Sequence, residues 1–240
     1  MKKILLATLL LTSLYAVAGG WETIEGNGNL KKEARDASGY TAVWSGGAFD
    51  VDISYGNSNS ITIEADENLL PYIETVVEGN ELKLRTKKGY NLKSKTKMKV
   101  AISLTKLTSL HVSGSGNVRG DGNFSNEGTT KISISGSGDI RLNFDKFSAL
   151  DVAISGSGNM HLKGKETSKI NAAVSGSGNV DAYDVSASEV TAMISGSGNV
   201  NVTASKSITA SIAGSGNVNY KGSANDVKQH AAGSGKVRKA

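Results

Sequence analysis

The stretch Ser113-Gly114-Ser115-Gly116-Asn117-Val118 decides the fold, because near copies of it recur throughout the C-terminal half of the chain. The later copies begin at Ser135, Ser155, Ser175, Ser195, Ala213 and Ala232. Neighbouring copies are therefore 22, 20, 20, 20, 18 and 19 residues apart. A steady period of about 20 residues is typical of a solenoid, whereas a propeller blade needs about 40. The sequence therefore predicts a stack of similar coils.

Apolar residues alternate with polar ones on both sides of each copy. Leu150, Val152 and Ile154 precede the copy at Ser155, and Met160 and Leu162 follow it. A spacing of two is the mark of a strand with one buried face, and flexible Gly/Ser linkers lack it. Each period thus reads as strand, Gly-Ser-Gly corner, strand and a variable polar connection such as residues 163–169. The predicted fold is all-β, a single-stranded β-helix (solenoid) with coils of about 20 residues.

The motif itself has a chemical interpretation. Glycine on both sides of the central serine permits a positive φ at the corner, and asparagine tolerates the same region. The residue after the second glycine would stack on its equivalents in neighbouring coils as a hydrogen-bonded structural ladder. Its members are Asn117, Asp139, Asn159, Asn179, Asn199 and Asn217. Calcium-binding repeats need an aspartate in nearly every copy, so no metal is predicted here.

Residues 1–18 read as a signal peptide rather than as part of the fold. Lys2 and Lys3 precede a short apolar run, and Ala16-Val17-Ala18 is a small-x-small cleavage pattern. No later stretch reaches the roughly 20 apolar residues of a membrane helix. The mature protein is expected to be periplasmic, outer-membrane-associated or secreted. Without the two signal lysines the formal net charge of +5 becomes +3, too mild to indicate nucleic acid.

The mature chain divides into a lead-in segment, 19–39, and one β-helix domain, 40–237. Within the domain, 40–109 is expected to form less regular coils and 110–237 regular ones. The segment Gly47–Ser54 resembles Ser148–Ser155 in its alternation, and residues 66–73 around Pro71 fit a short helical turn. The chain has no cysteine, which excludes disulfides, thiolate metal sites and a cysteine nucleophile.

No residue set has the spacing of a catalytic or cofactor site. The corner serines recur in every coil and lack the five-residue nucleophile elbow, and no dinucleotide or phosphate-binding loop occurs. His111, His161 and His230 lack metal-ligand spacing, and the first two fall at outward strand positions. The acidic candidates for a polysaccharide-cleaving enzyme fall at different phases of the coil; they are Asp139, Asp151, Asp181 and Asp184. We therefore predict no enzyme activity and no cofactor.

One surface is conspicuously basic, because eight cationic residues between 83 and 99 occur without an intervening acid. The candidate anionic-ligand patch comprises Lys83, Arg85, Lys87, Lys93, Lys95, Lys97 and Lys99. Since Met98, Val100 and Ile102 are expected to point inward on one strand, the lysines at 93–99 would share its outward face. Such a patch fits an anionic glycan, lipopolysaccharide or a membrane surface. Protection of an exposed sheet edge is the favoured alternative.

Four aromatic residues, Tyr40, Trp44, Phe49 and Tyr55, gather near the start of the domain. They could stack on a sugar. A cap over the open end of the coils is the favoured interpretation, because a solenoid needs its terminal apolar face covered.

Several segments resemble a known family. They are residues 61–73 (ITIEADENLLPYI), residues 79–84 (GNELKL) and the serial Ser-Gly-Ser-Gly-(Asn/Asp) corners. These segments are similar to the "putative auto-transporter adhesin, head GIN domain" family of Bacteroidetes-type bacteria, over about residues 40–237. The resemblance implies a right-handed β-helix and an exported location, and it brings no catalytic residues. Many relatives have aspartate at the corner where this chain mostly has asparagine.

Two functions follow from these observations. The leading hypothesis is an exported structural or binding module of the cell envelope, adhesin-like and without catalytic activity, whose flat face recognises a glycan or another cell-surface component. The alternative is a carbohydrate-active enzyme, a lyase or hydrolase, on the same scaffold. Two carboxylates within about 10 Å in a groove would favour the enzyme. The sequence leaves the oligomeric state open.

Overall fold

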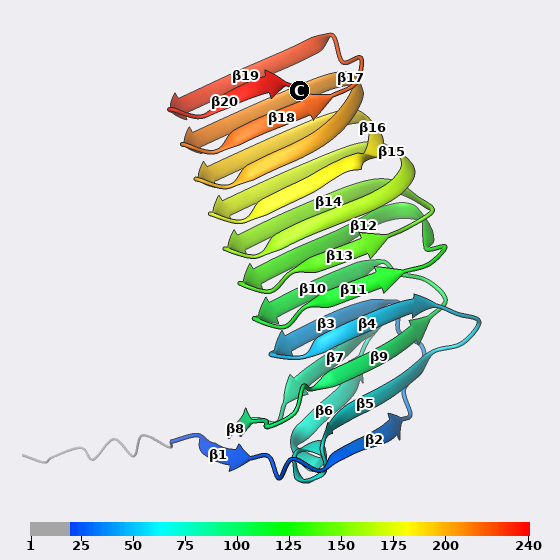
Figure 1. Cartoon of the computed structure of the whole chain (residues 1–240). Helices are drawn as coiled ribbons and strands as arrows, with labels where there is room; N and C mark the ends of the chain where they lie inside the picture. The colour runs from blue at the N-terminus through cyan, green and yellow to red at the C-terminus, as the bar shows by residue number, and fades with distance from the viewer. Residues whose placement is uncertain (1–19) are drawn as a thin grey trace, which may run out of the picture.

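A computed structural model describes residues 20–240, so the predicted signal peptide lies outside the described residues. The chain forms one elongated stack of β-coils, with a different arrangement of strands at its N-terminal end (Figure 1). We call the side built from residues before each corner face A, and the side built from residues after it face B. The predicted all-β solenoid with coils of about 20 residues is confirmed.

The strands follow the coil repeat. Face A contains β3 (Ala42–Gly47), β10 (Ser109–Gly114), β12 (Ser125–Gly136), β14 (Lys146–Gly156) and β19 (Asp226–Gly233). Face B contains β4 (Asp50–Tyr55), β11 (Val118–Asp121), β13 (Ile140–Asn143), β18 (Asn217–Lys221) and β20 (Lys236–Lys239). Three long strands run from face B into face A of the next coil: β15 (Asn159–Gly176), β16 (Asn179–Gly196) and β17 (Asn199–Gly214).

The long strands correct one expectation. Residues 163–169 are not a loop, because β15 continues through them and stays paired with β16, with register shifts at the bend. Thr167 is buried at this bend and donates a hydrogen bond to the carbonyl of Ser148 at 3.0 Å. Pairing with the next coil therefore holds the bend in extended form.

The two glycines of each corner are needed for different reasons. The first has a positive φ in every copy, for example +119° at Gly176. The second does not, contrary to the expectation; instead, a Cβ at Gly178 would lie 2.3 Å from the carbonyl oxygen of Gly158 in the preceding coil. Among residues 20–240, no residue other than glycine has a positive φ, so the corner asparagines do not use the left-handed region that the sequence allowed for them.

Inward side chains of both faces fill the interior. In β12, Ile132 and Ile134 are buried, and Ile140 and Leu142 of β13 face them from the other side. The same columns continue as Leu, Val, Ile, Met and Ala through the later coils. Burial of these columns, together with main-chain pairing, stabilises a chain that has no disulfide.

The coils at the N-terminal end do not stack in chain order. The coil formed by β3 and β4 pairs with β10 and β11 on one side. On its other side it pairs with β7 (Glu81–Thr86) and β9 (Lys99–Leu104), which come later than β3 and earlier than β10. The chain therefore passes to the far end of the stack after β4 and returns to continue on the opposite side.

The far end is closed by a cap of antiparallel strands. β6 (Ile73–Glu78) pairs with β7, β5 (Ser60–Asp66) pairs with β9, and β2 (Leu30–Arg35) pairs with β5. The helical turn predicted near Pro71 is confirmed as a 3-10 helix, η1 (Glu67–Tyr72). A separate pair, β1 (Glu22–Glu25) with β8 (Tyr90–Lys93), lies beside the cap.

Gly47–Ser54 shares the alternation of Ser148–Ser155, as expected, but the two segments are not equivalent in the coil: β4 follows a corner and belongs to face B, whereas β14 precedes a corner. The expectation that aromatic residues cover the end of the coils is wrong. Tyr40 and Phe49 are buried in the common core, and antiparallel strands cover the end instead.

A buried carboxylate ties the cap together. Asp66 is fully buried, and its Oδ1 accepts a hydrogen bond from the Gly28 amide at 3.1 Å. Its Oδ2 accepts from Ser94 Oγ at 2.8 Å and from the amides of Lys95 and Thr96 at 2.7 and 3.4 Å. Burial raises the pKa of Asp66, but these hydrogen bonds outweigh burial and leave the pKa lowered.

We expect Gly178→Ala to destabilise the solenoid by roughly 1–3 kcal/mol, the usual range for overpacking, because the new methyl group would press on a carbonyl oxygen. The exposed neighbour gives a matched control, Ser177→Ala, with an expected change within about 0.5 kcal/mol. Thermal unfolding followed by circular dichroism measures both. Equal melting of the two variants would show that the coils are not this close.

We expect Asp66→Asn to lower stability at pH 7 by about 2 kcal/mol, typical of a lost hydrogen bond to a charged group. Because the folded pKa of Asp66 is depressed, its contribution is present above the unfolded pKa of about 3.9 and is lost as pH falls through the folded value. The gap in urea midpoint between parent and variant should therefore narrow as the pH is lowered below about 4. The exposed Glu67→Gln variant is the control, and a gap that is independent of pH would contradict this account.

Candidate functional site

Face A carries an unusually flat run of small outward side chains. Strand pairing aligns Ser133, Ala153 and Ala173 in one column, with His111 at one end and Met193 at the other. A second column, beside the corners, has serine in five successive coils: Ser113, Ser135, Ser155, Ser175 and Ser195. Side chains this short leave the sheet surface open to a partner.

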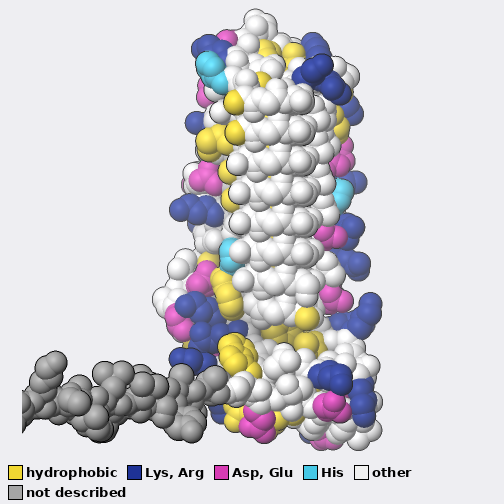
Figure 2. Space-filling view, turned by 90° about the vertical axis from the view of Figure 1, so that its left-hand side faces the viewer, with side chains coloured by type: hydrophobic (Ala, Val, Ile, Leu, Met, Phe, Trp, Pro, Cys, Tyr) yellow, Lys and Arg dark blue, Asp and Glu magenta, His cyan; other side chains and the backbone are white. Residues whose placement is uncertain are grey.

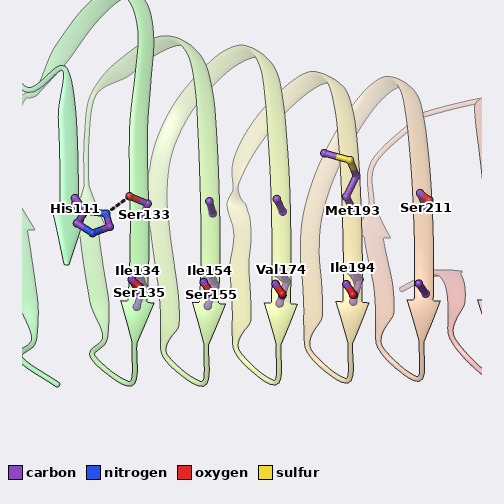
Figure 3. Close-up of a pocket in the computed structure, with 15 residues that line it drawn as sticks. His111, Ser133, Ile134, Ser135, Ile154, Ser155, Val174, Met193, Ile194 and Ser211 are labelled. Carbon is purple, nitrogen blue, oxygen red and sulfur yellow. Dashed lines mark hydrogen bonds between the residues drawn. The ribbon is translucent and has the colours of Figure 1, made fainter. Parts of the chain in front are cut away.

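A shallow groove follows these two columns along the solenoid axis. Its volume is about 690 Å³, and it extends from His111 to Ala213 (Figure 3). Met193 stands out from its floor with 53% of its surface exposed. The groove is lined by Ser, Ala, Ile, Val, Met and one His, without a carboxylate, lysine or arginine. It is therefore an uncharged, mostly apolar surface with hydroxyl groups at regular intervals.

The corners form an uncharged spine next to this groove. Figure 2 shows a smooth column without coloured side chains along the stack, with charged side chains confined to its flanks. Each central serine of the motif is exposed there. From Ser115 to Ser215 its amide also donates to the carbonyl of a corner glycine in the neighbouring coil, as in Ser177 to Gly156 at 3.0 Å. The spine is thus rigid in its main chain and polar at its surface.

The six predicted ladder residues lie in one column at the start of face B. Asn179 Nδ2 donates to Asn159 Oδ1 at 2.9 Å, and Asn199 Nδ2 donates to Asn179 Oδ1 at 2.9 Å. Asn217 continues the chain by donating to Asn199 Oδ1 at 3.2 Å. Every amide donates toward the N-terminal end of the stack.

The ladder has two segments, and each ends on a carboxylate. Asp139 Oδ1 accepts a hydrogen bond from Asn159 Nδ2 at 3.0 Å. An ionised carboxylate has no N–H or O–H, so the Asp139 side chain cannot donate to Asn117 in turn. Asn117 Nδ2 instead donates to Asp50 Oδ1 at 3.1 Å, and its Oδ1 accepts from the Asp139 amide. Asp50 was not predicted as a ladder partner, because only the pairing of β4 with β11 brings it to Asn117.

The predicted basic patch is divided by the fold. Lys93 ends β8 and Lys99 begins β9, with no strand between them, so the lysines at 93–99 do not share one strand face as expected. Three of the seven residues form ion pairs with glutamates: Lys83 with Glu78, Arg85 with Glu74 and Lys93 with Glu25. Hydrogen bonding and charge from Lys83 and Lys93 lower the pKa values of Glu78 and Glu25.

The other four residues lie apart. Lys87 follows β7, and the amide of Lys95 binds Asp66. Lys97 and Lys99 line a polar pocket of about 310 Å³ on face B, together with Arg119, Asp50 and Asp52. Arg119 was not predicted, because it reaches the lysines only through the pairing of β4 with both β11 and β9.

The remaining candidates are divided between the two faces. His161 Nδ1 lies 3.5 Å from Asp181 on exposed face B, and Lys163 lies 3.6 Å from Asp184. Asp151 is on face A and accepts a hydrogen bond from Asn171 Nδ2 at 2.7 Å. Among residues 20–240, no cluster of three or more His, Cys, Asp or Glu side chains could hold a metal ion.

Comparison with known proteins identifies the family. The family model described as "putative auto-transporter adhesin, head GIN domain" matches residues 39–224. The chain belongs to this family. The resemblance to the head GIN domain family that the sequence suggested is therefore confirmed. A search of curated proteins finds no match to it.

Solved structures share the fold of this head GIN domain. A putative adhesin from Bacteroides fragilis has a TM-score of 0.80 and 22% identity over 90% of this chain and 100% of its own. A putative lipid binding protein from Parabacteroides distasonis has a TM-score of 0.72 and 26% identity over 91% and 100%. A putative adhesin from Parabacteroides merdae has a TM-score of 0.70 and 22% identity over 91% and 99%.

One further observation concerns membranes. Within residues 20–240, no helix of this head GIN domain has the length and apolar character to cross a bilayer.

Two matched variants test the direction of the hydrogen bonds in the ladder. Asn179→Asp removes the amide that donates to Asn159 Oδ1 and places a carboxylate oxygen against it, so we expect a loss of about 1–2 kcal/mol. Asp139→Asn supplies a donor toward Asn117, so stability should be unchanged or higher. Urea unfolding at pH 7 measures both. A stable Asn179→Asp variant, or a large loss in Asp139→Asn, would contradict the directional ladder.

Proposed function

We propose that this head GIN domain is an exported binding module of the cell envelope, with no catalytic activity, that recognises an extended partner through face A. The observation that carries the proposal is the uncharged groove, which follows one face over the coils from His111 to Ala213. The family description and the export pattern of residues 1–18 support an envelope location, which would be periplasmic, outer-membrane-associated or secreted.

The shape of the groove supports binding rather than chemistry. Its lining has no carboxylate and no metal-ligand cluster, whereas cleavage of a polysaccharide requires acid and base groups at the bond that breaks. A stiff β-scaffold also presents its side chains with little loss of conformational entropy on binding. Both features favour recognition of a long surface component.

A second contact surface is the pocket of Lys97, Lys99 and Arg119 on face B. It is the part of the predicted anionic-ligand patch in which cations converge, although Asp50 and Asp52 offset most of its charge. Lys83, Arg85 and Lys93 are engaged with glutamates and fit the role of stabilising the cap.

The alternative function, a carbohydrate-active enzyme, has one observation in its favour. Asp50 and Asp52 line one pocket and, as alternate residues of a strand, are about 7 Å apart. Glycosidases place their acid against apolar surface, whereas three cations line this pocket and Asp50 is occupied by Asn117. The binding function therefore has the stronger support.

The proposal predicts saturable binding of the fluorescently labelled protein to isolated bacterial outer membranes. Ala173→Arg places a long cationic side chain across the groove floor and should weaken binding tenfold or more, about 1.4 kcal/mol or more. Asn201→Arg adds the same charge to face B and should leave binding unchanged. A reducing-sugar assay on the same membranes should show no release.

Equal binding by the parent and the Ala173→Arg variant would contradict the role of face A. Sugar release that is lost in Asp52→Asn would establish the enzyme instead.

A further inference from the structure

Trp44 occupies a special place at the end of the groove. It points outward from β3, one coil before His111. A Cβ at Gly46 would lie 2.1 Å from Trp44 Cη2 and 2.3 Å from Cζ3, so the indole lies flat over this glycine. In the next five coils the position of Gly46 is serine. The missing side chain is what allows the indole to lie against the sheet.

His111 extends this aromatic surface toward the groove. Its ring is 6.2 Å from the Trp44 ring between centroids, and the two planes differ by 16°. A hydrogen bond of 2.6 Å between His111 Nδ1 and Ser133 Oγ fixes the imidazole, which lies flat on the sheet in Figure 3. Burial lowers the pKa of His111, so the ring is neutral at pH 7, and the nearby Glu81 only partly opposes this.

The groove that starts at this platform has a polar side. Beside the floor residues Ala153 and Ala173 lies a smaller hollow of about 270 Å³, whose mostly apolar lining includes the polar side chains Lys131, Asp151 and Asn171. These three side chains follow one another in neighbouring coils, and their charges cancel. The opposite border is the serine column beside the corners. A ligand in the groove therefore meets apolar surface beneath it and hydrogen-bonding groups along both edges.

This combination matches a sugar chain. Pyranose rings have an apolar C–H face, which stacks on aromatic rings, and hydroxyl groups around the rim, which bind Asn, Asp, Lys and Ser. An acyl chain would leave the polar borders without partners and would remain exposed in so open a groove. An anionic polymer would find no net positive charge along it.

We propose that Trp44 and His111 form a stacking subsite for a neutral glycan, which continues along the groove of face A. This inference rests on the proposed function and adds the chemical class of the partner. Trp44 and His111 carry the ring of one sugar, and the serine column with Lys131, Asp151 and Asn171 binds the hydroxyl groups of the units that follow.

The test is calorimetric titration of the purified protein with neutral hexasaccharides: cello-, xylo-, manno- and laminari-oligosaccharides. At least one should bind, and Trp44→Ala should weaken it about tenfold or more, about 1.4 kcal/mol or more. Trp44→Phe retains a ring and should keep most of the affinity. Gly46→Ser restores the serine of the other coils, displaces the indole and should weaken binding although Trp44 is intact. Trp21→Ala removes an indole that is 68% exposed outside the groove and should have no effect.

The outcomes separate this inference from the proposed function. Unchanged affinity in both Trp44→Ala and Gly46→Ser, or no binding of any of the four sugars, overturns the glycan subsite. Binding to phosphatidylcholine vesicles without sugar binding overturns it in favour of a lipid. In each case the proposed function survives if Ala173→Arg still weakens binding to outer membranes tenfold or more, and it fails if that variant binds as the parent does.

Discussion

The close approach of the main chain at successive corners governs the rest of this structure. The second glycine of one corner lies so near the carbonyl of the corner before it that even a methyl group would collide, as at Gly178 against Gly158. The first glycine supplies the positive φ that turns the chain. Together they bring neighbouring coils to hydrogen-bonding distance and fix the register of every residue between two corners.

The two faces follow from this fixed register. Because equivalent residues superpose, a position that is small in each period becomes a smooth column, as in the serine column of face A. A position that is asparagine in each period becomes a directional chain of amides, as on face B. The groove and the ladder are therefore consequences of a repeat, whereas the Trp44–His111 platform is a local departure from it, made possible by Gly46.

The repeat explains how much could be predicted from the sequence. The coil, its period, the inward columns and the position of residues such as Asn159 and Asn179 follow directly from spacing and alternation. The cap could not be predicted, because β5 and β9 pair antiparallel in an order that local alternation does not encode. The face to which Gly47–Ser54 belongs could not be predicted either, because strands before and after a corner have the same period-two pattern.

The candidate site shows the same limit. Arg119 joins Lys97 and Lys99, and Trp44 joins His111, only because β3 and β4 lie between strands that are distant in the sequence. The fold also pairs residues that the sequence suggested were free. Lys83 and Arg85 were predicted to belong to a cationic surface, but they form ion pairs with glutamates of β6. Side-chain partners of this kind depend on which strands pair and in which register, and local sequence patterns do not determine either.

The most direct test of the stacked corners is a set of distances between spin labels on the exposed serines of the spine. The chain has no cysteine, so Ser115→Cys paired in turn with Ser177→Cys, Ser197→Cys and Ser215→Cys places labels only there. At about 4.8 Å per coil, pulsed electron paramagnetic resonance should give narrow distributions whose centres increase in equal steps, to a spine separation of about 24 Å for the last pair. Broad distributions, or distances that do not grow in equal steps along the series, would contradict the stacked corners and with them the groove and the ladder.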